Sequence, residues 1–170
     1  MKKISLLVIL TIVQLESFAQ TPYTILKDDQ HSGGFIFNGV LSKYILINEP
    51  SFKWYASNQL AYKPDVSIVN AMEAAKSSVH FVIFGGTWCD DTQFILPKFF
   101  KLQETSGFPD NGISFFGVNR DKKTWGNISD AFHVTNVPTI IVFKNGKEVG
   151  RVIEYGKTGK WDAELAELIK

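Results

Sequence analysis

The sequence predicts an α/β fold with a mixed central sheet and helices on both of its faces. Helical and strand patterns alternate from residue 65 onward, which is typical of parallel β–α–β units. The turn Asn145-Gly146 then joins two strand-like segments as a hairpin, which adds antiparallel strands to the sheet. With 170 residues, the chain is long enough for one such domain and too short for two of ordinary size.

Residues 1–19 have the composition of a cleaved secretory signal peptide. Lys2 and Lys3 precede an apolar run over 4–13, and Ala19 supplies the small residue expected before a cleavage site. A membrane-spanning helix needs roughly 20 apolar residues, and this run is shorter. We therefore expect a mature protein that is periplasmic or secreted, with no stable membrane insertion after cleavage.

The charges of the mature chain are balanced. Lys and Arg number 18 and Asp and Glu number 17, and removal of residues 1–19 takes two from the first group and one from the second, which leaves no net charge. Nucleic acids and anionic membranes attract proteins with an excess of positive charge, so neither is an expected partner. The chain has one cysteine, Cys89, and therefore cannot form an intramolecular disulfide.

Residues 20–64 are rich in turn-forming and aromatic residues. Their pattern predicts a short strand around 34–38 and a short helix over 42–47 that ends before Pro50, with a loop after it. A free tail would leave these aromatic side chains in water, so we expect an N-terminal extension that packs on the domain formed by residues 65–170.

The elements of that domain follow from apolar runs, which indicate buried strands, and from apolar residues at helical spacing. In chain order they are a helix over 66–77, a strand over 80–85, a helix over 88–104, a strand over 113–118, a short helix over 128–133, strands over 138–143 and 147–153, and a helix over 160–170. Asp65 can cap the first of these helices, and Pro97 should kink the second.

Two segments carry a specific combination of motifs. The first, GGTWCDDT, spans 85–92 at a predicted strand-to-helix junction, and Pro97 follows in the helix. The second, NVPTIIVFKNGK, spans 136–147. Together they resemble the thioredoxin superfamily, over about residues 66–170. The GTWCxDT version, with GVNRDKK at 117–123, is similar to a group of envelope thioredoxin-like proteins that have a single cysteine.

The resemblance implies that Cys89 is a nucleophile at a helix N-terminus and attacks a substrate disulfide. The second cysteine of the superfamily, which resolves the mixed disulfide, corresponds to Thr92 here. The buried acid on the preceding strand corresponds to Ile83, so the resolving thiol and its proton acceptor are both missing. The cis-proline segment that offers backbone hydrogen bonds to substrate corresponds to Val137-Pro138.

The reactivity of Cys89 depends on how readily it forms a thiolate. The helix N-terminus and a hydrogen bond from the Thr92 hydroxyl would favour the thiolate, whereas the charges of Asp90 and Asp91 would oppose it. We therefore expect Cys89 to be less acidic than the attacking cysteine of a dithiol relative. Two other interpretations stay open: the acids are also ordinary stabilisers of a first helical turn, and Trp88 is either a wall of the substrate groove or core packing.

These observations predict an exported thiol–disulfide oxidoreductase or isomerase that works through mixed disulfides at Cys89. Its substrates would be cysteine-containing envelope proteins or small-molecule disulfides, with an external thiol needed for turnover. The alternative is a redox-inactive module that binds peptides in the same groove. A thiol peroxidase is less favoured, because no arginine lies near Cys89 in the sequence. Neither a cofactor nor a metal is expected, since adjacent side chains such as Cys89, Asp90 and Asp91 point in different directions on a helix.

Overall fold

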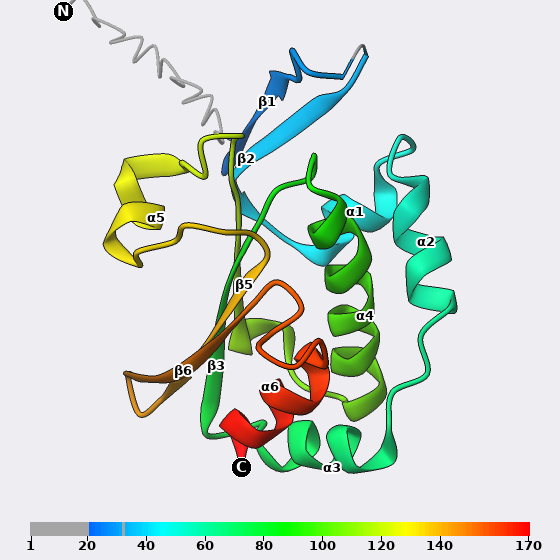
Figure 1. Cartoon of the computed structure of the whole chain (residues 1–170), viewed down its shortest axis with the longest axis vertical. Helices are drawn as coiled ribbons and strands as arrows, with labels where there is room; N and C mark the ends of the chain where they lie inside the picture. Colours follow the sequence, from blue (N-terminus) through cyan, green and yellow to red (C-terminus); the bar gives the residue numbers. More distant parts are fainter. Residues whose placement is uncertain (1–20, 32) are drawn as a thin grey trace, which may run out of the picture.

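The computed structural model describes residues 21–31 and 33–170, and the predicted signal peptide lies outside them. Within this part of the chain, one mixed sheet of six strands has the order β1-β2-β4-β3-β5-β6 (Figure 1). The strands are β1 (Tyr23–Lys27), β2 (Phe35–Leu41), β3 (Val79–Gly85), β4 (Ile113–Gly117), β5 (Thr139–Lys144) and β6 (Lys147–Ile153). β3 and β4 are parallel, and all other neighbouring strands are antiparallel.

Helices cover both faces of the sheet, as predicted. They are α1 (Lys43–Asn48), α2 (Lys53–Leu60), α3 (Val66–Ala74), α4 (Asp90–Ser106), α5 (Ile128–Ala131) and α6 (Trp161–Ile169). On one face α4 contacts α3 and α2, and α3 contacts α6, whereas α5 lies on the opposite face (Figure 1). None of the helices in the described part of the chain is long and apolar enough to span a membrane.

The central strand β3 divides its side chains between two hydrophobic cores. Phe81 and Ile83 belong to the larger core, which α4 covers, and Phe84 belongs to the smaller core on the side of α5. Successive side chains of a strand point to opposite faces, so a strand that is covered on both sides is apolar throughout. Ile83, which the resemblance sets in the place of a buried acid, is fully buried in this way and belongs to the core.

The predicted hairpin between β5 and β6 is confirmed. Asn145 and Gly146 both have positive φ, of 51° and 74°, and the register pairs Lys144 with Lys147. Both central residues of a type I′ turn need positive φ, and Asn followed by Gly adopts such values at low cost.

Two elements of the extension, which is defined from here on as residues 21–64, were not predicted. β1 is mostly exposed and lacks the alternation of apolar and polar residues that marks a half-buried strand. α2 buries only Tyr55 and has no apolar face at helical spacing, so contacts with α4 are what keep it in place. α4 also begins two residues later than predicted, which leaves Trp88 and Cys89 in the turn before the helix.

Close backbone approach joins the extension to the sheet. β2 pairs with β4, and the register sets Gly39 opposite Gly117. A Cβ atom on Gly117 would lie 2.2 Å from the carbonyl oxygen of Phe37, so only glycine allows β2 to come this close. β4 is therefore an inner strand rather than an edge of the sheet.

Candidate active site

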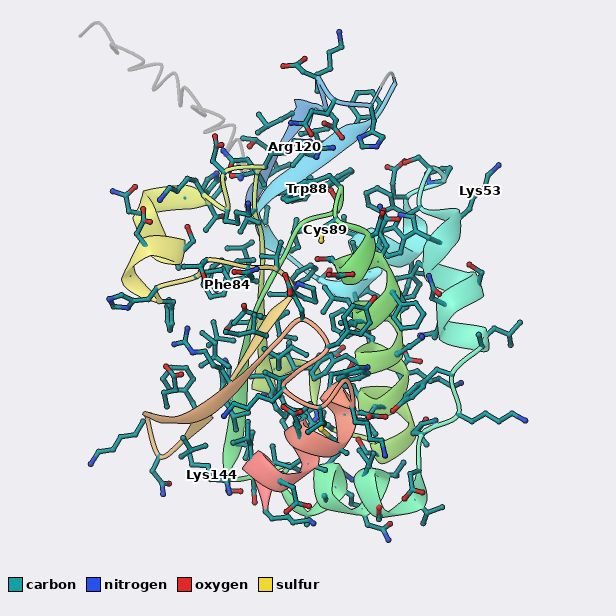
Figure 2. The ribbon with its side chains drawn as sticks, viewed as in Figure 1. Lys53, Phe84, Trp88, Cys89, Arg120 and Lys144 are labelled. Carbon is teal, nitrogen blue, oxygen red and sulfur yellow. The ribbon has the colours of Figure 1, made fainter. Side chains whose placement is uncertain are left out.

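Cys89 lies at the junction that the sequence predicted, where the chain turns from β3 into α4 (Figure 2). It is the N-cap residue of α4, and its side chain is half-buried. The thiol donates a hydrogen bond to the carbonyl oxygen of Val137, with the sulfur 3.2 Å from that oxygen. The Val137-Pro138 peptide bond is cis, so the structure brings the predicted nucleophile and the predicted docking segment together.

Trp88 packs against the smaller core, which is one of its two predicted roles, and part of its ring stays exposed. Its indole Nε1 donates to the carbonyl oxygen of Val118 at 3.0 Å. The ring also lies against Gly86, where a Cβ atom would be 2.6 Å from it. The glycine before the Thr-Trp-Cys sequence therefore makes room for the indole, which fixes one wall beside Cys89.

Thr92 is buried, and its hydroxyl accepts a hydrogen bond from the backbone N–H of Gly86 at 3.2 Å. The hydroxyl is thus turned toward the loop that precedes Cys89, and the hydrogen bond to sulfur that the sequence suggested is not formed. The residue that replaces the resolving cysteine stabilises the start of α4 against that loop.

Asp90 and Asp91 occupy the first turn of α4, as predicted. Asp90 is exposed, and Asp91 is half-buried beside Tyr155, a residue that the sequence analysis missed. Burial and, after it, a hydrogen bond with Asp91 raise the pKa of Tyr155. The Tyr155 ring also packs on Phe94, with 5.8 Å between ring centroids, so a half-exposed phenol borders the site on the side of α4.

Arg120 is the second residue that the sequence analysis missed. Its guanidinium lies 4.9 Å from the centroid of the Trp88 ring, so an arginine does stand beside the residue that precedes Cys89 (Figure 2). Arg120 Nε and Nη2 donate to the two carboxylate oxygens of Asp28, at 2.7 and 2.8 Å. Asp28 is buried, and these hydrogen bonds from Arg120 lower its pKa to about 2.

The extension is tied to the motif loop, defined here as residues 86–89, through Thr87. The buried Thr87 hydroxyl accepts from the backbone N–H of Phe37 at 3.2 Å and donates to the carbonyl oxygen of Phe35 at 3.5 Å. Its side chain therefore occupies the place of a pairing strand beside β2. Within residues 21–31 and 33–170, no group of three or more His, Cys, Asp or Glu side chains is arranged to hold a metal ion.

Comparison with known proteins places residues 66–169 in one family. The family model described as Thioredoxin matches residues 66–169, which is more than half of the chain. A thioredoxin of Echinococcus granulosus is 31% identical over 103 residues, covering 59% of this chain and 86% of that protein. A thioredoxin-like protein of Acanthamoeba polyphaga mimivirus is 30% identical over 76 residues, and the match spans 45% of this chain and about half, 53%, of the viral protein.

Among solved structures, a protein of unknown function from Pseudomonas aeruginosa has a TM-score of 0.54 at 11% identity, over 75% of this chain and 89% of that one, which supports the fold alone. The extension lies outside the range that the family model matches. The family model over residues 66–169 and the sequence relatives agree with the fold: the chain belongs to the thioredoxin family.

Proposed function

We propose that the protein is an exported thiol–disulfide oxidoreductase or isomerase that acts through Cys89 alone. The observation that carries this proposal is the half-exposed sulfur at the start of α4, 3.2 Å from the Val137 carbonyl oxygen and next to the cis proline. Its thioredoxin relatives suggest thiol–disulfide oxidoreductase-like chemistry. The single-cysteine mechanism and the export are our inference from the sequence.

The first step is attack of the Cys89 thiolate on one sulfur of a substrate disulfide. A bond forms between Cys89 and that sulfur while the substrate S–S bond breaks. The other substrate sulfur leaves as a thiolate and takes a proton from water. The product is a mixed disulfide between the protein and the substrate, with no net oxidation or reduction at this stage.

The mixed disulfide has no internal exit. Thr92 stands where a resolving thiol would be, and the buried Ile83 offers no group that could accept a proton. A second thiol of the same substrate can attack the substrate sulfur, which frees Cys89 and leaves a rearranged disulfide. Alternatively, a first external thiol attacks the Cys89 sulfur and releases the substrate as a free thiol, and a second external thiol then attacks the sulfur of the first. Cys89 is freed, the two external thiols leave as a disulfide, and the substrate has gained two electrons.

The Val137-Pro138 segment is the proposed docking edge for the substrate. An extended peptide can form backbone hydrogen bonds with such an edge in the manner of an added strand. The partly exposed Trp88 ring supplies an apolar surface beside the sulfur. Substrates that fit this arrangement are cysteine-containing envelope proteins, and small-molecule disulfides also fit it.

A redox-inactive peptide-binding module is the alternative function. The replacement of the resolving cysteine by Thr92 and of the buried acid by Ile83 supports it, because both changes remove catalytic parts and keep the docking edge. The two functions differ in whether a covalent adduct forms at Cys89.

A trapping experiment separates them. The wild type and Cys89→Ala are incubated with a protein that carries scrambled disulfides, quenched with acid, and separated on non-reducing gels. We expect adducts with the wild type that reducing agent removes, no adducts with Cys89→Ala, and faster recovery of native disulfides when a small thiol is added. Adducts with both proteins or with neither would contradict the catalytic proposal.

A further inference from the structure

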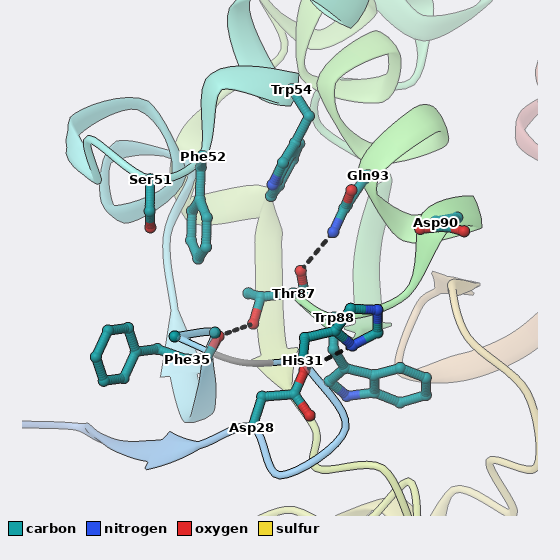
Figure 3. A pocket seen from close by; sticks show the side chains of 12 residues that line it. Asp28, His31, Phe35, Ser51, Phe52, Trp54, Thr87, Trp88, Asp90 and Gln93 are labelled. Atoms are coloured by element: carbon teal, nitrogen blue, oxygen red, sulfur yellow. Dashed lines mark hydrogen bonds and ion pairs between the residues drawn. The ribbon is translucent and has the colours of Figure 1, made fainter.

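A cavity of about 300 Å³ lies between the extension and the motif loop (Figure 3). Trp88 and Asp90, the sequence neighbours of Cys89, are among the residues that line it. Three parts of the chain form it: the loop between β1 and β2, the turn into α2, and the motif loop with the first turn of α4. Its walls include the aromatic side chains of Phe35, Phe52, Trp54 and Trp88 and the polar side chains of Asp90 and Gln93. Pockets for drug-sized ligands are about 300–1,000 Å³, so this cavity lies at the small end of that range and has room for one long side chain.

The aromatic walls are held in place on both sides. Phe52 and Trp54 pack on each other with ring centroids 5.1 Å apart, and they form the wall that the extension provides (Figure 3). Trp88 forms the facing wall and is fixed by its hydrogen bond to Val118. The faces of aromatic rings, those of tryptophan above all, attract cations.

Of the two carboxylates at the cavity, Asp28 has a cationic partner and Asp90 has none among the described residues. Both carboxylate oxygens of Asp28 are bound by Arg120. Asp90 is exposed and makes no ion pair within the described residues. Gln93 donates its amide N–H to the carbonyl oxygen of Thr87 at 2.9 Å, which leaves the side-chain oxygen as an acceptor. No lysine or arginine lines the cavity; His31 does, and its ring nitrogen faces Asp28 and Arg120 rather than Asp90.

We propose that this cavity is a specificity site that takes a lysine or arginine side chain located near the reacting cysteine of a substrate polypeptide. The cation would lie against the Trp54 ring, because the Arg120 guanidinium already lies over the Trp88 ring, and the Asp90 carboxylate would meet its charged end. Trp88 and Asp90 both border the cavity and flank Cys89 in the chain, so the cavity adjoins the turn that carries the attacking cysteine. The proposal rests on the proposed function and specifies its substrate class.

Pairs of short peptides test this proposal. Each peptide carries a single cysteine joined through a disulfide to thionitrobenzoate, and one member of a pair has lysine where the other has uncharged norleucine, at one of the two positions on either side of the cysteine. Attack by Cys89 on the peptide sulfur forms the mixed disulfide and releases the coloured thionitrobenzoate thiolate. The readout is the ratio of second-order rate constants within a pair, which cancels general changes in thiol reactivity.

We expect the lysine peptide to react about tenfold faster at one or more positions, a ratio equivalent to one moderate ionic or cation–π contact. Asp90→Asn and Trp54→Leu should each reduce the ratio to within about twofold of unity. The matched variants are Asp91→Asn, whose carboxylate does not line the cavity, and Trp125→Leu, whose ring is exposed elsewhere; both should keep the wild-type ratio. A ratio near one in the wild type, or an unchanged ratio in Asp90→Asn, would overturn the proposal.

Failure of the covalent chemistry is detected separately. Fluorescent versions of the same peptides, without thionitrobenzoate, are titrated with Cys89→Ser and followed by anisotropy. Tighter binding of the lysine peptide, together with no thionitrobenzoate release by the wild type, would reject the exchange function and support the cavity as a site for basic side chains. Equal binding of both peptides, together with equal reaction rates, would reject the site and leave the exchange function standing.

Discussion

At the scale of single residues, the surroundings of Cys89 come from segments that are distant in the sequence. Val137, 48 residues away, provides the carbonyl oxygen that meets the thiol, and Arg120 lies over the neighbouring indole ring. Asp28, which is 92 residues from Arg120 in the sequence, fixes that arginine through hydrogen bonds. The chemistry at Cys89 therefore depends on side chains whose proximity only the fold establishes.

The Asp28–Arg120 pair should make stability depend on pH in the acidic range. The pKa of Asp28 falls from an ordinary 3.8 to about 2 in the folded chain, chiefly through hydrogen bonds from Arg120. Above about pH 5 the carboxylate is ionised in both the folded and the unfolded chain, and the pair contributes fully. As the pH falls from about 4 to 2, the unfolded chain binds the proton first, so this contribution is lost.

Melting temperatures of the wild type and Asp28→Asn between pH 2 and 7 measure this effect. We expect the difference between them to be constant above about pH 5 and to shrink steadily below about pH 4. Asp29→Asn, a change at the exposed neighbouring carboxyl, should follow the wild type across the range. A difference that does not vary with pH would contradict the assignment.

Replacement of Gly86 or Gly117 by alanine should destabilise the protein by different amounts. In Gly86→Ala the new Cβ would lie 2.6 Å from the Trp88 ring, and that ring can shift. We therefore expect the free energy of unfolding to fall by about 1–3 kcal/mol and the tryptophan fluorescence to change. In Gly117→Ala the new Cβ would lie 2.2 Å from the backbone oxygen of Phe37 and would oppose the pairing of β2 with β4. Because backbone cannot move aside as a side chain can, the free energy of unfolding should fall by more than in Gly86→Ala. Urea unfolding compares the two variants, and the reverse order would contradict this account.

At the scale of elements, the extension and the motif loop behave as one unit because Thr87 replaces a missing strand partner. The backbone of β2 turns toward the motif loop near Phe35 and Phe37, and the Thr87 hydroxyl serves both its N–H and its C=O groups. Buried backbone groups need partners, so the threonine before Trp88 has a structural reason to carry a hydroxyl.

Thr87→Val should therefore destabilise the protein despite its similar shape. The buried Phe37 N–H loses its acceptor, and an unsatisfied buried donor costs about 1–3 kcal/mol. Urea unfolding measures the loss, and amide exchange should show weaker protection of the Phe37 N–H. Thr105→Val removes an exposed hydroxyl on α4 and is the matched control, with a change expected below about 0.5 kcal/mol. Equal stability of Thr87→Val and the wild type would show that the hydroxyl is not needed.

The elements that could be predicted from the sequence are those whose own residues show a clear pattern of apolar side chains or a specific turn motif. β3 and β5 are apolar on both faces, and Asn145-Gly146 marks its own turn, so these were found. β1 and α2 were missed because their patterns are weak and partners elsewhere in the chain stabilise them. The site divides in the same way: the motif residues Cys89 and Pro138 were found, whereas Arg120 was not, because nothing near it in the sequence indicates its partner.

At the scale of the whole molecule, the extension completes the larger core of the domain. Five of its buried side chains belong to that core: Phe37, Leu41, Leu46, Phe52 and Tyr55. Polar contacts reinforce the same packing. The Lys43 ammonium donates to the Gln103 side-chain oxygen at 3.0 Å, and the Tyr62 hydroxyl donates to Asp162 at 2.7 Å. The extension thus contacts both α4 and α6, far from the motif loop.

A chain without residues 21–64 should consequently fail to fold cooperatively. Burial of each large apolar side chain contributes roughly 1.5–3 kcal/mol, and five of them approach the whole stability of a typical domain, about 5–15 kcal/mol. The deletion also leaves β4 as an unpaired edge strand beside an exposed core, which favours aggregation. Size-exclusion chromatography and urea unfolding compare this deletion with the chain that begins at residue 21. We expect a folded monomer only from the longer chain. A cooperative transition at the same urea midpoint in both chains would contradict this, because it would show that residues 66–169 fold independently of the extension.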